Sequence, residues 1–166
     1  GDMLLFESVE YIFSILRPEP WVQIWPERCG SPGATVCYVG GPGGLIITME
    51  ELDDLPRGSR NRDGYVDFLF EIFDNGGDFE ILQFRESVTE QGYPVDIFSL
   101  SSQEDEIALE RFIFVDEDQR VAFNATIFIA TEMYETLTPA INYVQDSFRY
   151  WPCLLYTSPS PRDLAQ

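Results

Sequence analysis

Two alternating runs joined by a short polar turn constrain the fold of this chain most strongly. Apolar and aromatic side chains alternate along residues 109–115 and again along residues 121–129. The segment "DEDQ" at residues 116–119 lies between them and is typical of a turn. A period of two on both sides of such a turn indicates an antiparallel β-hairpin. The sequence therefore predicts a hairpin here, within a sheet that is mostly antiparallel.

Further strands are predicted where short apolar runs are bounded by glycine, proline or polar residues. These runs are residues 21–25, 35–39, 65–73, 78–86 and 94–100. In the run 65–73, Val66, Phe68, Phe70 and Ile72 share one face, and "DNGG" at residues 74–77 is typical of a hairpin turn. We expect a strand to follow this turn as far as Glu86; the alternative is a helix that begins at Asp78.

Apolar residues at helical spacing predict a helix near each end of the chain. Residues 3–17 carry apolar side chains every three or four positions, at Leu5, Val9, Ile12 and Leu16. Near the other end, Thr138 and Pro139 suit an N-cap and a first helical turn, and Ile141, Val144 and Phe148 follow. The predicted fold class is α+β, a mostly antiparallel sheet with an N-terminal and a C-terminal helix packed on it.

The glycine-rich segment "GGPGG" at residues 40–44 has two interpretations. A glycine-rich turn before a helix can present N–H groups to a phosphate, and Thr48 with Glu51 suits a capping box that opens a short helix over residues 48–55. The spacing matches no phosphate-binding motif, however, and four carboxylates at positions 50, 51, 53 and 54 would repel a phosphate. We therefore interpret the segment as a tight turn.

The charge of the chain excludes several classes of function. The formal net charge is −19, and all ten basic residues are arginines, with no lysine and no histidine. Catalysis by a Ser-His-Asp or Cys-His arrangement, a Schiff-base lysine or an imidazole-bound zinc ion would need the missing residues. A negative surface also opposes direct binding of nucleic acid and favours a basic protein partner. No apolar run is long enough to span a membrane and no signal peptide is recognised, so we expect a cytoplasmic or virion-associated protein.

The last residues differ in character from the rest of the chain. The peptide "CLLYTSPSPRD" at residues 153–163 is similar to one reading frame of the adaptor DNA used in sequencing libraries. We therefore expect residues 153–166 to be a non-native tail and residues 1–152 to be one acidic α+β domain, truncated after Trp151. Within that domain two cysteines remain, Cys29 and Cys37, which either form a disulfide across a short loop or are free and buried.

The most specific local pattern for a binding site lies at residues 59–67. Oxygen-bearing side chains occur at alternate positions, Ser59, Asn61, Asp63 and Asp67, with Gly64 and the backbone carbonyl of Tyr65 between them. This pattern resembles the first nine positions of an EF-hand calcium loop. The resemblance implies a Ca²⁺ site made by Ser59, Asn61, Asp63, Tyr65 and Asp67.

The same segment departs from the calcium-loop pattern in two ways. The first position is a serine, and the last position, where a bidentate acid is expected, is Phe70, with Glu71 one residue late. Three neighbouring arginines, Arg57, Arg60 and Arg62, would also oppose a cation and could instead contact a carboxylate. The alternative to calcium binding is an Asp-Gly turn that leads into a strand.

The sequence predicts a non-enzymatic, acidic domain for protein interaction or assembly. A phage or mobile element is the source we expect, and the domain would serve there as a structural component or as an inhibitor that imitates nucleic acid. Its partner would be a basic protein or further copies of itself. The alternative function is a module binding calcium or another divalent cation at residues 59–67, with carboxylate-only hydrolysis as its extension.

Overall fold

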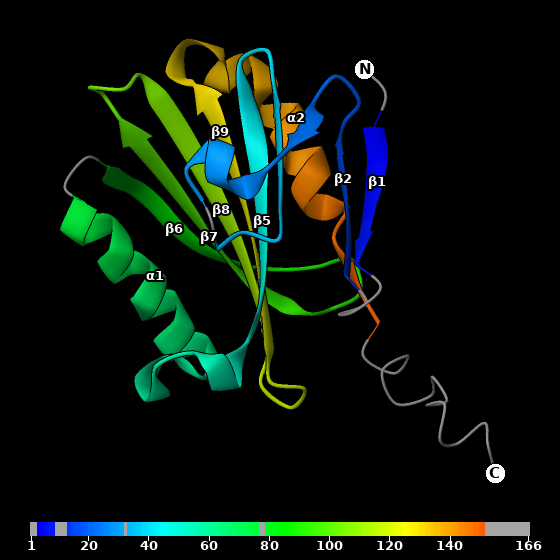
Figure 1. Ribbon diagram of the computed structural model, residues 1–166, viewed down its shortest axis with the longest axis vertical. Coiled ribbons are helices and arrows are strands. Elements are labelled where there is room, and N and C mark those ends of the chain that lie inside the picture. Colours follow the sequence, from blue (N-terminus) through cyan, green and yellow to red (C-terminus); the bar gives the residue numbers. More distant parts are fainter. Residues whose placement is uncertain (1–2, 9–12, 32, 77–78, 152–166) are drawn as a thin grey trace.

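The computed structural model describes residues 3–8, 13–31, 33–76 and 79–151. Figure 1 shows a large twisted sheet with one helix, α1, on one face, and a second helix, α2, with a small sheet on the other face. Both sheets are antiparallel throughout. The predicted α+β class is therefore confirmed, whereas the positions of the helices differ from the prediction.

The large sheet has seven strands in the order β3-β4-β5-β9-β8-β7-β6. Its strands are β3 (Val22–Ile24), β4 (Val36–Gly40), β5 (Gly43–Glu51), β6 (Glu80–Val88), β7 (Pro94–Ser102), β8 (Ile107–Asp116) and β9 (Val121–Ala130). The hairpin that dominates the sequence pattern is confirmed as β8 and β9, in which Phe114 pairs with Phe123. The predicted strands at residues 21–25, 35–39, 78–86 and 94–100 are confirmed as β3, β4, β6 and β7.

The small sheet consists of β1 (Met3–Ser8), β2 (Phe13–Pro18) and β10 (Arg149–Tyr150). The predicted helix over residues 3–17 is therefore wrong. Strand β2 pairs with both β1 and β10, and its residues Phe13 and Ile15 are fully buried in the main core, whereas Leu4 and Leu5 of β1 are exposed. These long-range contacts prevail over the helical spacing of the apolar residues. Val9 and Ile12, on which the helical spacing also depended, lie outside the described residues.

Helix α1 (Arg62–Gly76) occupies the segment for which a strand and a hairpin turn were predicted. That prediction is wrong because the segment buries Tyr65, Val66 and Leu69, which share one face of a helix, and leaves Ile72 half exposed. The buried face packs on a second apolar cluster made with residues of β7, β8 and β9, including Phe98, Leu100 and Leu109. Tertiary burial at helical spacing has thus prevailed over the local alternation.

Helix α2 (Tyr134–Asp146) confirms the predicted C-terminal helix but begins five residues earlier than expected, at Tyr134 instead of Pro139. Thr138 is not its N-cap, since its hydroxyl donates a hydrogen bond to the carbonyl of Tyr134 inside the helix. Pro139 likewise lies within the helix. The helix ends before Phe148, which is nevertheless buried together with Ile141 and Val144.

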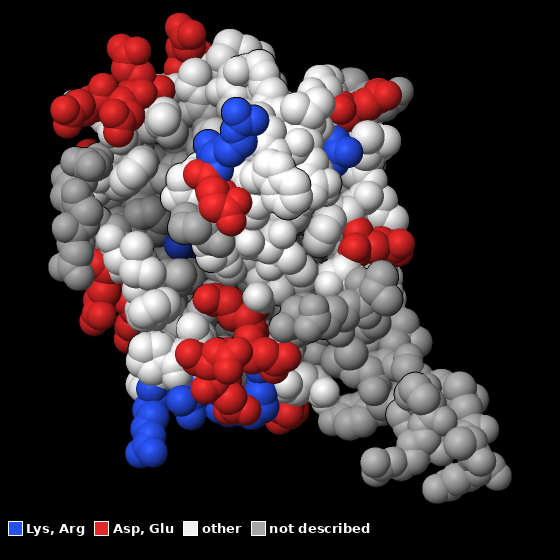
Figure 2. Space-filling model, in the orientation of Figure 1, with Lys and Arg blue, Asp and Glu red and all other residues white. Residues whose placement is uncertain are grey.

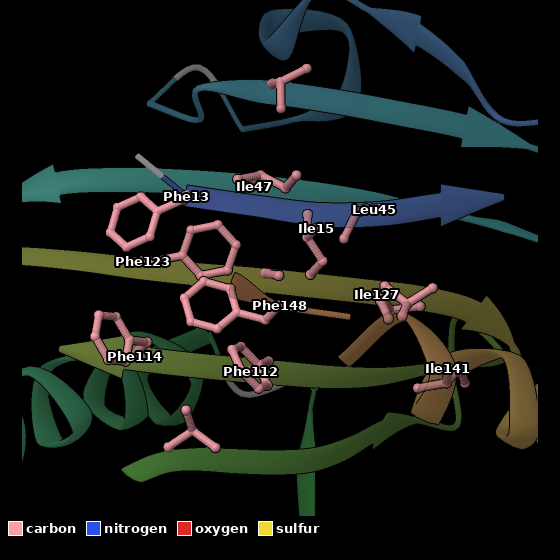
Figure 3. Packing of buried hydrophobic residues seen from close by; sticks show 14 of the residues in the cluster. Phe13, Ile15, Leu45, Ile47, Phe112, Phe114, Phe123, Ile127, Ile141 and Phe148 are labelled. Atoms are coloured by element: carbon pink, nitrogen blue, oxygen red, sulfur yellow. The ribbon is translucent and has the colours of Figure 1, made fainter. Parts of the chain in front are cut away.

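The main apolar core lies between the large sheet and the layer formed by α2 and the small sheet. Figure 3 shows Phe13 from β2, Phe112 and Phe114 from β8, Phe123 from β9 and Phe148 facing one another there. The ring centroids of Phe123 and Phe148 are 4.7 Å apart, and those of Phe13 and Phe123 are 5.1 Å apart. Aromatic side chains therefore join the two layers.

The loops settle three further points. The glycine-rich segment at residues 40–44 contains the predicted tight turn, in which Gly41 and Pro42 join β4 to β5 and Gly41 has φ +49°. The predicted short helix at residues 48–55 is wrong, because β5 continues through Glu51 and only the 3₁₀ turn η2 (Leu52–Asp54) follows. Cys29 and Cys37 form a disulfide, which confirms the first of the two alternatives.

Among the described residues, no helix has the length and apolar character needed to cross a membrane.

Candidate functional site

The segment that resembles a calcium loop forms the start of helix α1. Ser59 is buried in the 3₁₀ turn η3 (Arg57–Ser59), and Asn61 stands immediately before the helix. The Oδ1 atom of Asn61 accepts a hydrogen bond from the backbone N–H of Gly64 at 2.7 Å, which is the geometry of an N-cap. A Cβ atom on Gly64 would lie 1.9 Å from the carbonyl oxygen of Gly58, so this glycine allows the helix to pack against η3.

The five predicted calcium ligands do not share one surface. Asp63 and Asp67 are exposed, one turn apart on α1, whereas Ser59 is buried in η3, and the carbonyl group of Tyr65, the predicted ligand, belongs to the helical backbone. The expected loop conformation is therefore wrong, because residues 62–67 are helical. Within the described part of the chain, no group of three or more Asp, Glu, Cys or His side chains is placed to hold a metal ion. Calcium binding at this segment stays a prediction.

Two of the arginines around this segment form contacts within the protein. Arg62 forms a bidentate pair with Asp96 of β7, with Nε–Oδ2 and Nη2–Oδ1 distances of 2.8 and 2.9 Å. Asp96 is only 3% exposed, and the hydrogen bonds that it accepts from Arg62, together with its negative charge, raise the pKa of Arg62. The Nε of Arg60 donates a hydrogen bond to the carbonyl of Leu55. The carboxylate contact considered from the sequence is thus observed for Arg62, and it fixes the first turn of α1 to the sheet.

A buried polar cluster lies between α1 and the sheet. The hydroxyl of Tyr65 donates a hydrogen bond to Glu50 of β5 at 2.5 Å and accepts one from the amide of Asn124 of β9 at 2.7 Å. Burial, reinforced by the charge of Glu50, raises the pKa of Tyr65, and burial lowers the pKa of Arg111 to about 10. Asn124, which belongs to the sequon "NAT", is buried in this cluster and is not exposed to a glycosylating enzyme.

We expect the buried phenol of Tyr65 to make the wild type lose more stability, or gain less, than the variant Tyr65→Phe as the pH rises above about 10. The unfolded chain releases the phenol proton near the ordinary pKa of 10.0, whereas the folded chain retains it. The folded state then binds more protons, so the stability that is present below pH 10 is lost above it. The lowered pKa of Arg111 acts in the opposite direction, so the comparison with the variant isolates Tyr65. Urea unfolding at pH 7 and pH 10.5 measures the difference, and equal pH dependence in both proteins would contradict the burial of this phenol.

The surface with the clearest binding character is the outer strand of the large sheet. Strand β6 pairs with β7 alone among the described elements, so one side of its backbone has no neighbouring strand there. Four large apolar side chains on this strand are at least one-third exposed: Ile81, Leu82, Phe84 and Val88. We call this strand and these side chains the β6 edge. Unpaired N–H and C=O groups beside exposed apolar side chains form a template for adding another strand.

The sequence analysis did not identify the β6 edge. The sequence nevertheless contains a sign of an exposed apolar side chain here. Ile81 and Leu82 are adjacent, and in a strand adjacent side chains point to opposite faces of the sheet. The register between β6 and β7 shifts at this point, between Ile81 and Gln83. Leu82 is left 59% exposed beside this irregularity.

Acidic side chains lie along and beside the β6 edge. Glu80 and Glu86 are exposed on the strand, and the turn between β7 and β8 adds Glu104, Asp105 and Glu106 near its first residues. On the face seen in Figure 2, acidic groups gather at the upper and the lower ends, and the arginines at the lower end lie beside acidic groups.

Two arginines also lie at this edge, since Arg85 of β6 is 3.9 Å from Glu110 and Arg62 is 4.0 Å from Glu86. The edge therefore combines exposed apolar side chains with charged neighbours that are mostly acidic.

Comparisons with known proteins identify a fold but no family. No family model matches the chain, and no curated protein matches it. Among solved structures, the chain is similar to cyanobacterial PsbP (CyanoP) from Synechocystis sp. PCC 6803, with 14% identity, 90% of this chain and 92% of that chain covered, and a TM-score of 0.66.

Two further solved structures share the architecture. One is the Ran-binding protein Mog1p of Saccharomyces cerevisiae, with 9% identity, 90% and 95% of the two chains covered, and a TM-score of 0.55. The other is protein PA94 of Pseudomonas aeruginosa, with 12% identity, 92% and 99% covered, and a TM-score of 0.51. At these identities the likeness establishes the fold alone: the chain has the α+β fold seen in CyanoP, Mog1p and PA94.

Proposed function

We propose that this protein is a non-enzymatic protein-binding domain that takes up an extended, basic segment of a partner along the β6 edge. The observation that carries the proposal is the nine-residue outer strand β6, which exposes four large apolar side chains and pairs on one side only among the described elements. An added strand would satisfy its backbone groups, and the apolar side chains would provide the burial that stabilises the complex.

The charge of the molecule favours a basic partner over a second copy of the chain. Two copies paired through β6 would bring Glu80 and Glu86 of each strand close to those of the other, and each copy carries a net charge of −19. Like charges placed across an interface oppose association, whereas a basic segment is attracted. The register shift in β6 also disfavours pairing with an identical strand.

The comparison with Mog1p is compatible with this proposal. That protein is described as Ran-binding, so the same fold occurs in a protein that binds another protein. Its sequence identity of 9% transfers no residue and no partner to this chain. An inhibitor whose carboxylates imitate nucleic-acid phosphates remains one form of the proposal, and a phage or mobile-element source remains a hypothesis from the sequence.

Replacing Leu82 with arginine is expected to weaken peptide binding about tenfold or more, because the new charge lies on the docking strand and repels a basic segment. The probes are peptides of nine residues, the length of β6, selected for binding from a random displayed library and then measured one at a time by fluorescence anisotropy. We expect the selected peptides to alternate apolar and basic residues and to bind more weakly as the salt concentration rises.

The matched control is Val22→Arg. Val22 lies on β3, the other outer strand, and is 60% exposed, compared with 59% for Leu82. Both variants change the net charge equally, but only Leu82 lies on the proposed docking strand. We therefore expect only Leu82→Arg to bind the selected peptides more weakly. If no peptide is enriched, or if the two variants bind the selected peptides equally, the β6 edge is not the binding surface.

A further inference from the structure

An apolar pocket opens between α2, β9 and the turn that joins β4 to β5. Its volume is about 280 Å³, and each of its 13 lining residues is an apolar residue or a glycine. Ile127 and Ile129 of β9 form its floor, and Leu137, Ala140 and Val144 of α2 form one wall. The opposite wall includes Trp21, which is buried, and the turn at Gly41 and Pro42, which is exposed at the rim. The pocket therefore reaches both the main core and the surface.

The walls of this pocket are held in place by contacts outside it. The guanidinium of Arg17 lies 4.3 Å from the ring centroid of Tyr38 and also donates a hydrogen bond to the carbonyl of Trp21. A Cβ atom on Gly40 would lie 2.7 Å from Cδ1 of Trp21, so the glycine lets the turn pack directly against the indole. These contacts fix the wall opposite α2, and the cavity is preformed rather than opened by a ligand.

We propose that this pocket binds a small, uncharged apolar molecule with two or three aromatic rings or an equivalent aliphatic skeleton. No lining side chain offers a charge, a hydroxyl or an amide, and the indole N–H of Trp21 is the one side-chain hydrogen-bond donor among the lining residues, so the wall offers little compensation for a buried polar group of a ligand. An apolar cavity of about 150 Å³ accepts benzene, and the volume here is nearly twice as large. A helix of a partner protein, about 10 Å across, is too wide.

The charge of the protein further restricts the ligand. A net charge of −19 gives the protein a negative overall field, which opposes the approach of anions such as free fatty acids and phospholipids. The apolar lining of the pocket and the negative charge of the protein thus both favour a neutral ligand. This site is separate from the β6 edge, since no lining residue belongs to β6.

The test uses two fluorescent probes that share an aromatic skeleton. N-phenyl-1-naphthylamine is neutral, and 8-anilinonaphthalene-1-sulfonate carries a sulfonate on the same rings. We expect the full chain to bind the neutral probe saturably with one site per chain, and to bind the sulfonate about tenfold or more weakly. Absence of saturable binding of the neutral probe would overturn the proposal, and equal affinity for the two probes would overturn the restriction to neutral ligands.

Two phenylalanine variants on the same helix locate the binding site. Ala140→Phe adds a ring to the pocket wall and should reduce affinity for the neutral probe about tenfold or more, because the ring occupies the cavity. Asn142→Phe adds the same ring at an exposed position of α2 and should bind the probe as the wild type does. Equal binding by the two variants would place the probe elsewhere and overturn the proposal. If Ala140→Phe does not fold, Ala140→Leu, which fills the same space less fully, serves in its place.

Discussion

Replacing Phe148 with alanine is expected to lower the free energy of unfolding by about 3 to 5 kcal/mol, as for other large aromatic side chains removed from a core. Phe148 is fully buried, and its ring centroid lies between 4.7 and 5.9 Å from the rings of Phe123, Phe112, Phe114 and Phe13. These rings come from β9, β8 and β2, so the loss affects the packing of the small sheet on the large one. Urea unfolding, with the midpoint and slope compared with those of the wild type, measures the change.

The control for this prediction is Tyr143→Ala. Tyr143 lies on α2, five residues before Phe148, and is 56% exposed. Its removal is expected to change the free energy of unfolding by about 0.5 kcal/mol or less, as for most exposed positions. If the two variants lose similar stability, Phe148 does not occupy the core described above.

Strands were predictable from the sequence where alternation and turn residues agreed. The hairpin of β8 and β9 has both signals: a period of two over both strands and the polar turn that begins at Asp116. Asp116 also accepts hydrogen bonds from the backbone N–H groups of Asp118 and Gln119, which stabilises this turn locally. The secondary structure of a segment can be predicted from one sequence when its local turn chemistry and its burial in the fold favour the same structure.

Two wrong predictions have a common physical cause: residues 3–17 were predicted as a helix but include strands β1 and β2, and residues 65–73 were predicted as a strand but form part of α1. Residues 3–17 suit a helix by spacing and residues 65–73 suit a strand by alternation, but neither pattern reveals which side chains will meet a core. Phe13 and Ile15 are buried by the aromatic core, and Tyr65 and Leu69 by the opposite face of the sheet. These contacts join residues far apart in the chain, which local periodicity does not contain.

The candidate surfaces depended even more on tertiary structure. Asn61 and Gly64 were predicted as positions of a calcium loop, and the structure shows an N-cap at Asn61 and a close approach of Gly64 to Gly58. The β6 edge follows from the order of strands, and the apolar pocket from the meeting of β9, α2 and the turn at residues 41–42. Neither the β6 edge nor the apolar pocket is encoded in a single segment. The sequence did predict the acidic surface, which follows from composition alone.

Replacing Arg62 with methionine is expected to lower the free energy of unfolding by about 3 kcal/mol, because the buried carboxylate of Asp96 loses its bidentate partner. The value lies at the lower end of the range for a broken buried pair, since the side chain of Arg62 is 30% exposed whereas that of Asp96 is 4% exposed. The double variant Arg62→Met with Asp96→Leu should regain most of the lost stability, because no unpaired charge then remains buried. A double-mutant cycle by urea unfolding separates the pairing from the cost of the isolated charge.

The control pair for this cycle is Arg120 and Asp53, whose Nη2–Oδ1 distance is 2.7 Å, close to the distances in the Arg62–Asp96 pair. In the control both side chains are exposed, at 42% and 65%, so water replaces the lost partner and Arg120→Met should hardly change the unfolding midpoint. The comparison of the two pairs tests whether the loss of stability comes from the burial of the carboxylate or from the geometry of the ion pair. Equal losses in Arg62→Met and Arg120→Met would mean that Asp96 is solvated, and α1 would then be held to the sheet by its apolar face and the cluster around Tyr65 alone.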